Sequence, residues 1–207
     1  MDKRIKMSDK DMINYYIREQ KALEYGTDFF EDICRMNIKT IENKILPLCF
    51  YNQMDEFLYS LDVGDRMAIR GGFCHAGDKQ AYIRIGIDTT NSILNKNFKQ
   101  IIRHEIIHYY LWLVNLPFDD NSLEFWCMCY AFDAGAYEEL EYDDEEYYEK
   151  FVELYKKYAE PFKNKGWVYS VMIGQMIVAI NESSIEEYED KIIQLSDQCN
   201  KLCMMKI

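Results

Sequence analysis

The sequence predicts a mainly helical α+β fold with a small antiparallel β-hairpin in the first half of the chain. Apolar residues recur at helical spacing in segments near both ends of the chain. Between these segments, residues 82–87 alternate with the two-residue period of a strand, and "HAGDK" separates this run from "RMAIRGGFC". These patterns favour a helical core that carries one small sheet.

The N-terminal segment predicts two helices. Ser8 is a suitable cap for the first helix, and Gly26 is a suitable residue to end it. The second helix is expected from about residue 27 onwards, where apolar residues follow a roughly helical spacing. Pro47 forbids much continuation of this second helix.

Further helices are expected after the hairpin. The first covers about residues 98–114, with Asn97 as its cap and "VNLP" as its terminator. "SLEFWCMCYAF" predicts a second, buried helix, and Ser184 with Glu187 forms a capping box before another apolar helical pattern. We therefore expect a core at residues 1–137, which includes the N-terminal helices. An acidic segment and a C-terminal helical extension at residues 138–207 are expected to pack on that core.

Composition and charge exclude several classes of partner. The 207 residues carry a formal net charge of -12, which repels a phosphate backbone, so direct nucleic-acid binding is not expected. The start of the chain is charged, and no apolar run reaches the roughly 18–20 residues of a membrane span. The seven cysteines lack a disulfide-scaffold pattern. These features predict a cytoplasmic protein with reduced thiols and no membrane partner, and they leave open a homo-oligomer through the C-terminal helices.

One stretch, "RHEIIHYYLWL" at residues 103–113, carries the strongest chemical signal. On a helix, residues four apart are separated by about 40° of rotation and one turn, so His104 and His108 can present their imidazoles to one ion. Glu105 lies about 100° from His104 around the helix, which keeps it from binding the ion directly but within reach of a water on it. The HExxH motif predicts one catalytic Zn²⁺, two histidine ligands and Glu105 as the catalytic base.

The motif leaves the third protein ligand of the zinc ion open. Catalytic zinc sites take three protein ligands and leave the fourth position to water. Asp119, Asp120 and Glu124 lie just beyond the motif helix, and each carries a suitable carboxylate. His75 is a weaker candidate, because it lies in a predicted turn where a solvated histidine is the more common outcome.

Three segments, "AIRGGFC", "AYIRIGID" and "NFKQIIRHEIIHYYLWLVNLPFDDNSLEFW", resemble the core of the SprT-like metallopeptidases, a family that includes the Spartan proteases. The resemblance implies a zincin-like metallopeptidase core with a hairpin before the HExxH helix. It implies that His104 and His108 bind zinc and that Glu105 is the base. It also places the third ligand, usually a histidine a few residues before a phenylalanine, at Asp120, with Phe125 as the aromatic residue. "CNKLC" supplies a single pair of cysteines, so the C-terminal zinc ribbon of many members is not expected.

Together, the motif and the resemblance predict an intracellular zinc metallopeptidase. We expect it to hydrolyse peptide bonds of a protein or peptide substrate with a metal-activated water and Glu105 as general base. The first alternative is an IrrE-like regulatory metallopeptidase, whose third ligand would be a glutamate on the next helix, here Glu124. The second is a catalytically silent metal-binding interaction module. An iron oxygenase with two histidines and one carboxylate ranks last, because it leaves Glu105 unexplained.

Overall fold

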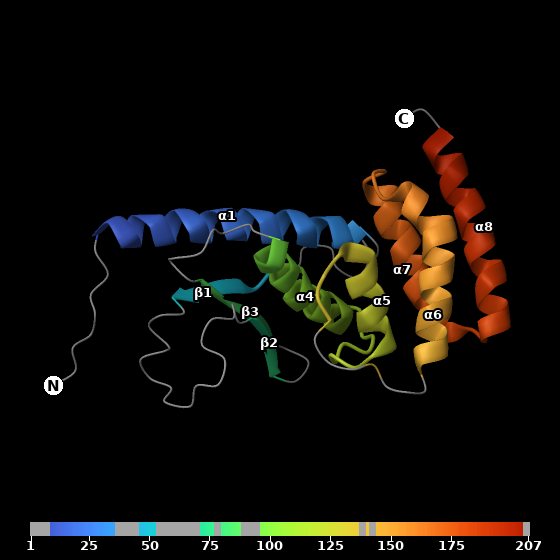
Figure 1. Cartoon of the computed structure of the whole chain (residues 1–207), viewed down its shortest axis with the longest axis horizontal. Coiled ribbons are helices and arrows are strands. Elements are labelled where there is room, and N and C mark those ends of the chain that lie inside the picture. Colours follow the sequence, from blue (N-terminus) through green and yellow to red (C-terminus); the bar gives the residue numbers. More distant parts are fainter. Residues whose placement is uncertain are drawn as a thin grey trace.

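The computed structural model describes residues 9–35, 46–52, 71–76, 80–87, 96–136, 140 and 144–204. Within these ranges most residues are helical and the strands form one small sheet, which confirms the mainly helical α+β prediction. Figure 1 shows one long N-terminal helix lying across the sheet and the HExxH helix, with the C-terminal helices grouped beside them. The HExxH helix therefore lies between the small sheet and the C-terminal helices.

The first helix, α1 (Asp9–Cys34), is continuous, so the prediction of a helix end at Gly26 is wrong. Gly26 is buried, and a Cβ at this position would lie 2.7 Å from Leu48 Cδ2. The glycine therefore provides room for close packing against the neighbouring strand. Residues 27–34 of the predicted second helix continue α1. The rest of that helix, residues 36–45, and the predicted cap Ser8 lie outside the described residues.

Three strands form the sheet in the order β1 (Leu48–Asn52), β3 (Gln80–Ile87), β2 (Gly71–Ala76). β2 and β3 run antiparallel, whereas β1 runs parallel to β3 and is not predicted by the sequence. In the central strand Ile83 and Ile85 are fully buried, and Tyr82 and Arg84 are exposed. This alternation gives the sheet one face that packs on helices.

The HExxH helix is α4 (Lys96–Leu113), and it contacts α1, β2, β3 and the following helix α5 (Leu123–Phe132). Asn97 lies inside α4, so the prediction of Asn97 as its cap is wrong. Phe98 is buried in the same first turn. Packing of this aromatic side chain therefore anchors the start of α4, where the sequence had suggested a polar cap.

The C-terminal part begins with α6 (Glu145–Leu154), which continues into a π-helical turn, η3 (Tyr155–Ala159), and a 3₁₀ turn, η4 (Glu160–Phe162). Next come α7 (Trp167–Glu182) and α8 (Ile185–Met204), and the Glu187 backbone N–H donates to Ser184 Oγ at the start of α8, as predicted. α7 contacts α1, α5, α6 and α8, which makes it the central helix of this part. The boundary between a core and an extension near residue 137 stays a prediction.

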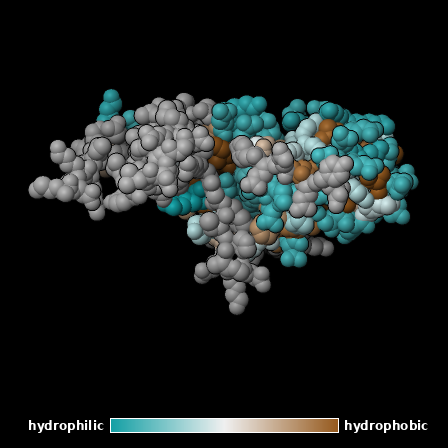
Figure 2. Space-filling view, turned by 60° about the horizontal axis from the view of Figure 1, so that its bottom comes forward, coloured by the Kyte–Doolittle hydropathy of each residue, from teal (hydrophilic) through white to brown (hydrophobic). Residues whose placement is uncertain are grey.

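One face of the molecule is largely polar in its described part. On the face drawn in Figure 2, most of the coloured residues are hydrophilic, and hydrophobic residues appear in small areas among them. Each helix in the described ranges is too short or too polar to cross a lipid bilayer. Among the described residues, Cys34, Cys49, Cys127, Cys129, Cys199 and Cys203 are free cysteines. Their reduced state in the cell stays a prediction.

Candidate metal centre

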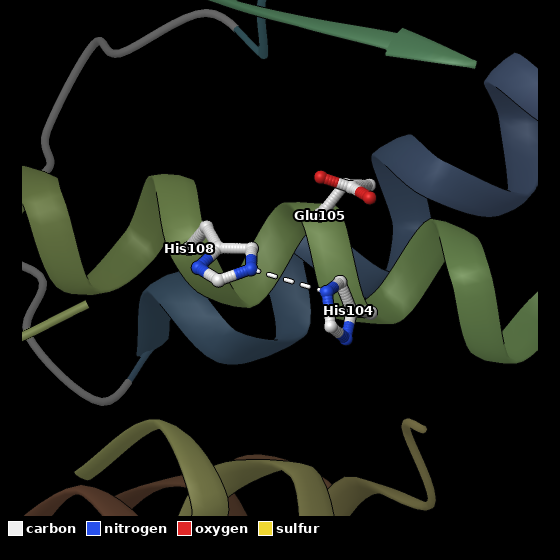
Figure 3. A group of neighbouring side chains, drawn as sticks. All are labelled: His104, Glu105 and His108. Carbon is white, nitrogen blue, oxygen red and sulfur yellow. Dashed lines mark hydrogen bonds between the residues drawn. The ribbon is translucent and has the colours of Figure 1, made fainter. Parts of the chain in front are cut away.

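The two histidines of α4 lie on one face of the helix, and their imidazole rings are directed towards each other (Figure 3). The Nε2 atoms of His104 and His108 are 3.1 Å apart. Glu105 is also buried, and one carboxylate oxygen of Glu105 and one nitrogen of each histidine lie within 4.8 Å of one another. The predicted grouping of these three side chains is therefore confirmed, and it forms a cluster that can hold a metal ion.

Backbone carbonyl groups fix the orientation of both imidazoles. His104 Nδ1 donates to the carbonyl oxygen of Gly135, and His108 Nδ1 donates to that of Phe118. A carbonyl oxygen only accepts, so Nδ1 carries the proton in each ring. Burial lowers the pKa of His104 to about 4, despite the opposing hydrogen bond to Gly135, so this ring is neutral near pH 7. A neutral ring protonated at Nδ1 directs the lone pair of Nε2 into the cluster.

The end of α4 places the carbonyl group that His108 uses. Asn115 has a positive φ of 58°, and the backbone N–H of Leu116 donates to the Leu111 carbonyl at 3.0 Å. The N–H of Asn115 donates to Trp112, which completes a Schellman motif. This turn reverses the chain at the predicted "VNLP" terminator, and Phe118 follows it directly.

The end of α5 places the other carbonyl group in the same way. Asp133 has a positive φ of 53°, and the N–H of Ala134 donates to the Cys129 carbonyl at 2.9 Å. The N–H of Asp133 donates to Tyr130, so this helix also ends in a Schellman motif. Gly135, the partner of His104, is the next residue after Ala134.

Asp120 lies opposite the two histidines. Its Oδ1 atom is 3.2 Å from His104 Nε2 and 3.3 Å from His108 Nε2. The close approach of His108 holds the pKa of Asp120 below its usual value, so the carboxylate is charged at neutral pH. The indole N–H of Trp126 donates to the backbone carbonyl of Asp120 at 2.8 Å and holds this turn against α5.

The other two candidate carboxylates occupy a different pocket. Glu124 is buried in the first turn of α5, and Asn181 Nδ2 donates to its Oε1 at 2.5 Å. Asp119 and Glu124 line this pocket together with Asp144 and Asn181. Of the three candidates after the motif, the structure therefore brings Asp120 to the histidines. The side chain of His75 lies outside the described residues.

An aromatic side chain closes one side of the histidine pair. The ring of Phe125 is stacked on His108 with a centroid distance of 4.0 Å, and it meets the edge of His104 at 4.9 Å. Phe125 is fully buried, so it restricts the movement of both imidazoles. Tyr109 is also buried and packs against Phe30, as expected for a core residue.

The part of the chain that contains this cluster matches a known protein family. Residues 43–122 match the SprT-like family. This SprT-like segment contains both histidines, Glu105 and Asp120, and it ends two residues before Glu124. The match confirms the resemblance predicted from the sequence. No curated protein and no solved structure matches the chain.

Several residues that support the cluster were not predicted from the sequence. Phe118 and Gly135 contribute backbone carbonyls, which any residue type carries, so composition offers no signal for them. Trp126 reaches back to the Asp120 carbonyl across the start of α5, a contact that depends on how this turn folds. Asn181 holds the other acid, Glu124, from a helix 57 residues later in the chain. The positive φ at Asn115 had a sequence signal, since asparagine is enriched in this conformation.

Proposed function

We propose that this chain is an intracellular, zinc-dependent SprT-like metallopeptidase with a zincin-like core. In this proposal His104, His108 and Asp120 hold one zinc ion, and Glu105 is the general base for hydrolysis of a protein or peptide substrate. The observation that carries the proposal is the meeting of Nε2 of His104, Nε2 of His108 and Oδ1 of Asp120. These three atoms are separated by 3.1, 3.2 and 3.3 Å.

This triangle fits a metal ion better than a network of hydrogen bonds. Both Nδ1 protons are donated to carbonyls, so in the Nδ1–H tautomer that binds a metal all three converging atoms are acceptors. Three acceptors at these distances repel one another unless a cation lies between them. Ligands about 2.0–2.1 Å from a tetrahedral zinc ion lie about 3.3 Å from each other, close to the observed separations. Two imidazoles and one carboxylate also form an accepted ligand set for catalytic zinc.

The residues around the triangle have separate tasks in the proposed reaction. A zinc ion bound here would lower the pKa of a water molecule and polarise the scissile carbonyl group. The Glu105 carboxylate accepts the proton of the attacking water and returns it to the leaving amine. The Phe118 and Gly135 carbonyls keep the imidazole lone pairs directed inwards. Phe125 excludes water from one side of the rings.

The test separates metal binding from hydrolysis with two substitutions. His108→Ala is expected to lose the roughly one zinc ion per chain of the wild type, as measured by elemental analysis. Glu105→Gln is expected to retain zinc and to lower the cleavage rate of a denatured protein by about 10²–10⁴-fold, because an amide cannot accept the proton. His75→Ala is the matched histidine control and should retain both zinc and activity.

The outcomes distinguish the proposal from a catalytically silent module. Equal zinc content in wild type and His108→Ala would reject the metal site. If the wild type binds zinc but cleaves neither denatured nor folded proteins, the catalytically silent module is favoured. The aspartate at the position of the family's usual histidine also supports that alternative. Cleavage that persists in Glu105→Gln would remove Glu105 as the base.

A further inference from the structure

Arg103 precedes His104 in α4 and links three helices. Its Nε donates to the Tyr25 hydroxyl of α1 at 2.6 Å. Its Nη1 donates to the carbonyl of Phe132 at 2.8 Å and to that of Asp133 at 3.2 Å, both at the end of α5. The side chain is 23% exposed, so these bonds are only partly screened by solvent.

The bonds of Arg103 complete the C-terminal end of α5. The last four carbonyls of a helix have no partner within the helix. Here the Schellman turn satisfies the first two, at Cys129 and Tyr130, and the Tyr169 hydroxyl donates to the third, at Ala131. Arg103 satisfies the fourth, at Phe132, and it brings a positive charge to the negative end of the helix dipole.

The turn after α5 is also held by the side chain of Asp133. Its carboxylate lies 3.6 Å from Arg103 Nη1, accepts from Gln100 Nε2 at 3.3 Å and lies 3.9 Å from Lys96 Nζ. All three partners belong to α4, at positions that share one helix face. Since Gly135 is two residues beyond Asp133, a span of at most about 7 Å, fixing Asp133 restricts the position of the Gly135 carbonyl.

We propose that Arg103 is a positioning residue for His104: it fixes the end of α5 and thereby the Gly135 carbonyl that orients the His104 imidazole. The contact of His108 with Phe118 provides an internal reference. The Phe118 carbonyl follows the turn at the end of α4. None of the Arg103 bonds described above reaches this turn. Loss of Arg103 therefore affects one histidine and spares the other.

The test measures the two Nδ1–H protons by NMR in the full chain without metal, where three histidines give few imidazole signals. In Arg103→Met, the His104 Nδ1–H is expected to exchange with water faster than in the wild type, while the His108 Nδ1–H keeps its rate. Lys99→Met is the matched control, because Lys99 also lies over the Tyr25 ring but one turn earlier in α4. It should leave both protons unchanged.

Two results would overturn the proposal: unchanged exchange at His104, or equal acceleration at both histidines, which would indicate general loosening. If Arg103→Met fails to fold, Arg103→Lys replaces it, and the same change at His104 alone is expected. Lysine keeps the positive charge but lacks the planar guanidinium that binds Tyr25 and the end of α5 together.

A zinc titration extends the test and rests on the proposed function. Zinc affinity is expected to fall about 10–100-fold in the Arg103 variant. An unchanged affinity would contradict the effect of Arg103 on metal binding. If the wild type binds no zinc, the proposed function fails, while the exchange experiment still decides the role of Arg103.

Discussion

Asp120 and Glu124 are carboxylates four residues apart, yet the structure gives them different environments. Asp120 lies in the turn before α5, and its Oδ1 is within 3.3 Å of both histidine Nε2 atoms. Glu124 lies in the first turn of α5, and Asn181 of α7 binds its carboxylate in a separate pocket. The start of α5 therefore decides which acid faces the histidines: the acid before the helix reaches them, and the one inside it faces α7.

The largest expected difference between the two acids is in zinc affinity. Asp120→Ala removes one of the three proposed zinc ligands. It should weaken zinc binding by more than roughly 100-fold, because residues that only support a ligand already cost up to about 100-fold. Glu124→Ala should retain zinc within a few-fold. Competition with a zinc-binding dye measures both. The reverse result would assign the third ligand to Glu124 and favour the IrrE-like alternative.

A smaller effect is expected in the stability of the metal-free protein. Glu124→Ala removes the carboxylate that Asn181 binds. Because Asn181 is exposed and can bind water instead, the free energy of unfolding should fall by about 1–2 kcal/mol, the value of one hydrogen bond to a charged group. Glu124→Gln can still accept the Asn181 bond and serves as the control, with a smaller loss. Urea denaturation followed by circular dichroism measures both. Equal stability of the alanine variant and the wild type would show that the bond to Asn181 does not hold Glu124.

The smallest expected effect comes from the bond that holds the Asp120 turn. Trp126→Phe removes the indole N–H that donates to the Asp120 carbonyl, at a cost of about 1 kcal/mol or roughly fivefold in zinc affinity. Trp167→Phe, at a partly exposed tryptophan of α7, is the control and should leave zinc affinity unchanged. A similar change in both variants would assign the effect to general stability.

The sequence predicts a structural feature well when the residues that cause it are close together in the chain. His104 and His108 were predicted because the helical period alone places them on one face, and Glu105 was predicted because the HExxH motif places it next to His104. Asp120 was predicted as the third ligand from the family resemblance, because the spacing of the residues allowed three different acids in that role. Gly26 was misinterpreted because its role depends on Leu48, a residue that meets α1 only in the folded chain.

The same limit applies to elements that depend on tertiary pairing. β1 has five residues, too few to show a clear alternation, and its parallel partner β3 lies more than 30 residues later. Asn97 has the residue type of a helix cap, but buried Phe98 in the same turn anchors the start of α4. Sequence patterns therefore predicted α4 without its correct first residue, and they missed β1 altogether.

The two turns with positive φ also affect when the site can form during synthesis. The histidines are four residues apart, but their carbonyl partners lie 10 residues away for His108 and 31 residues away for His104. A nascent chain that has emerged only as far as α4 carries the complete HExxH motif without either orienting carbonyl. His108 acquires its partner when the turn after α4 has emerged, and His104 only after α5 has docked and ended. If the cluster binds zinc as proposed, the growing chain would therefore reach full zinc affinity only after α5 is complete.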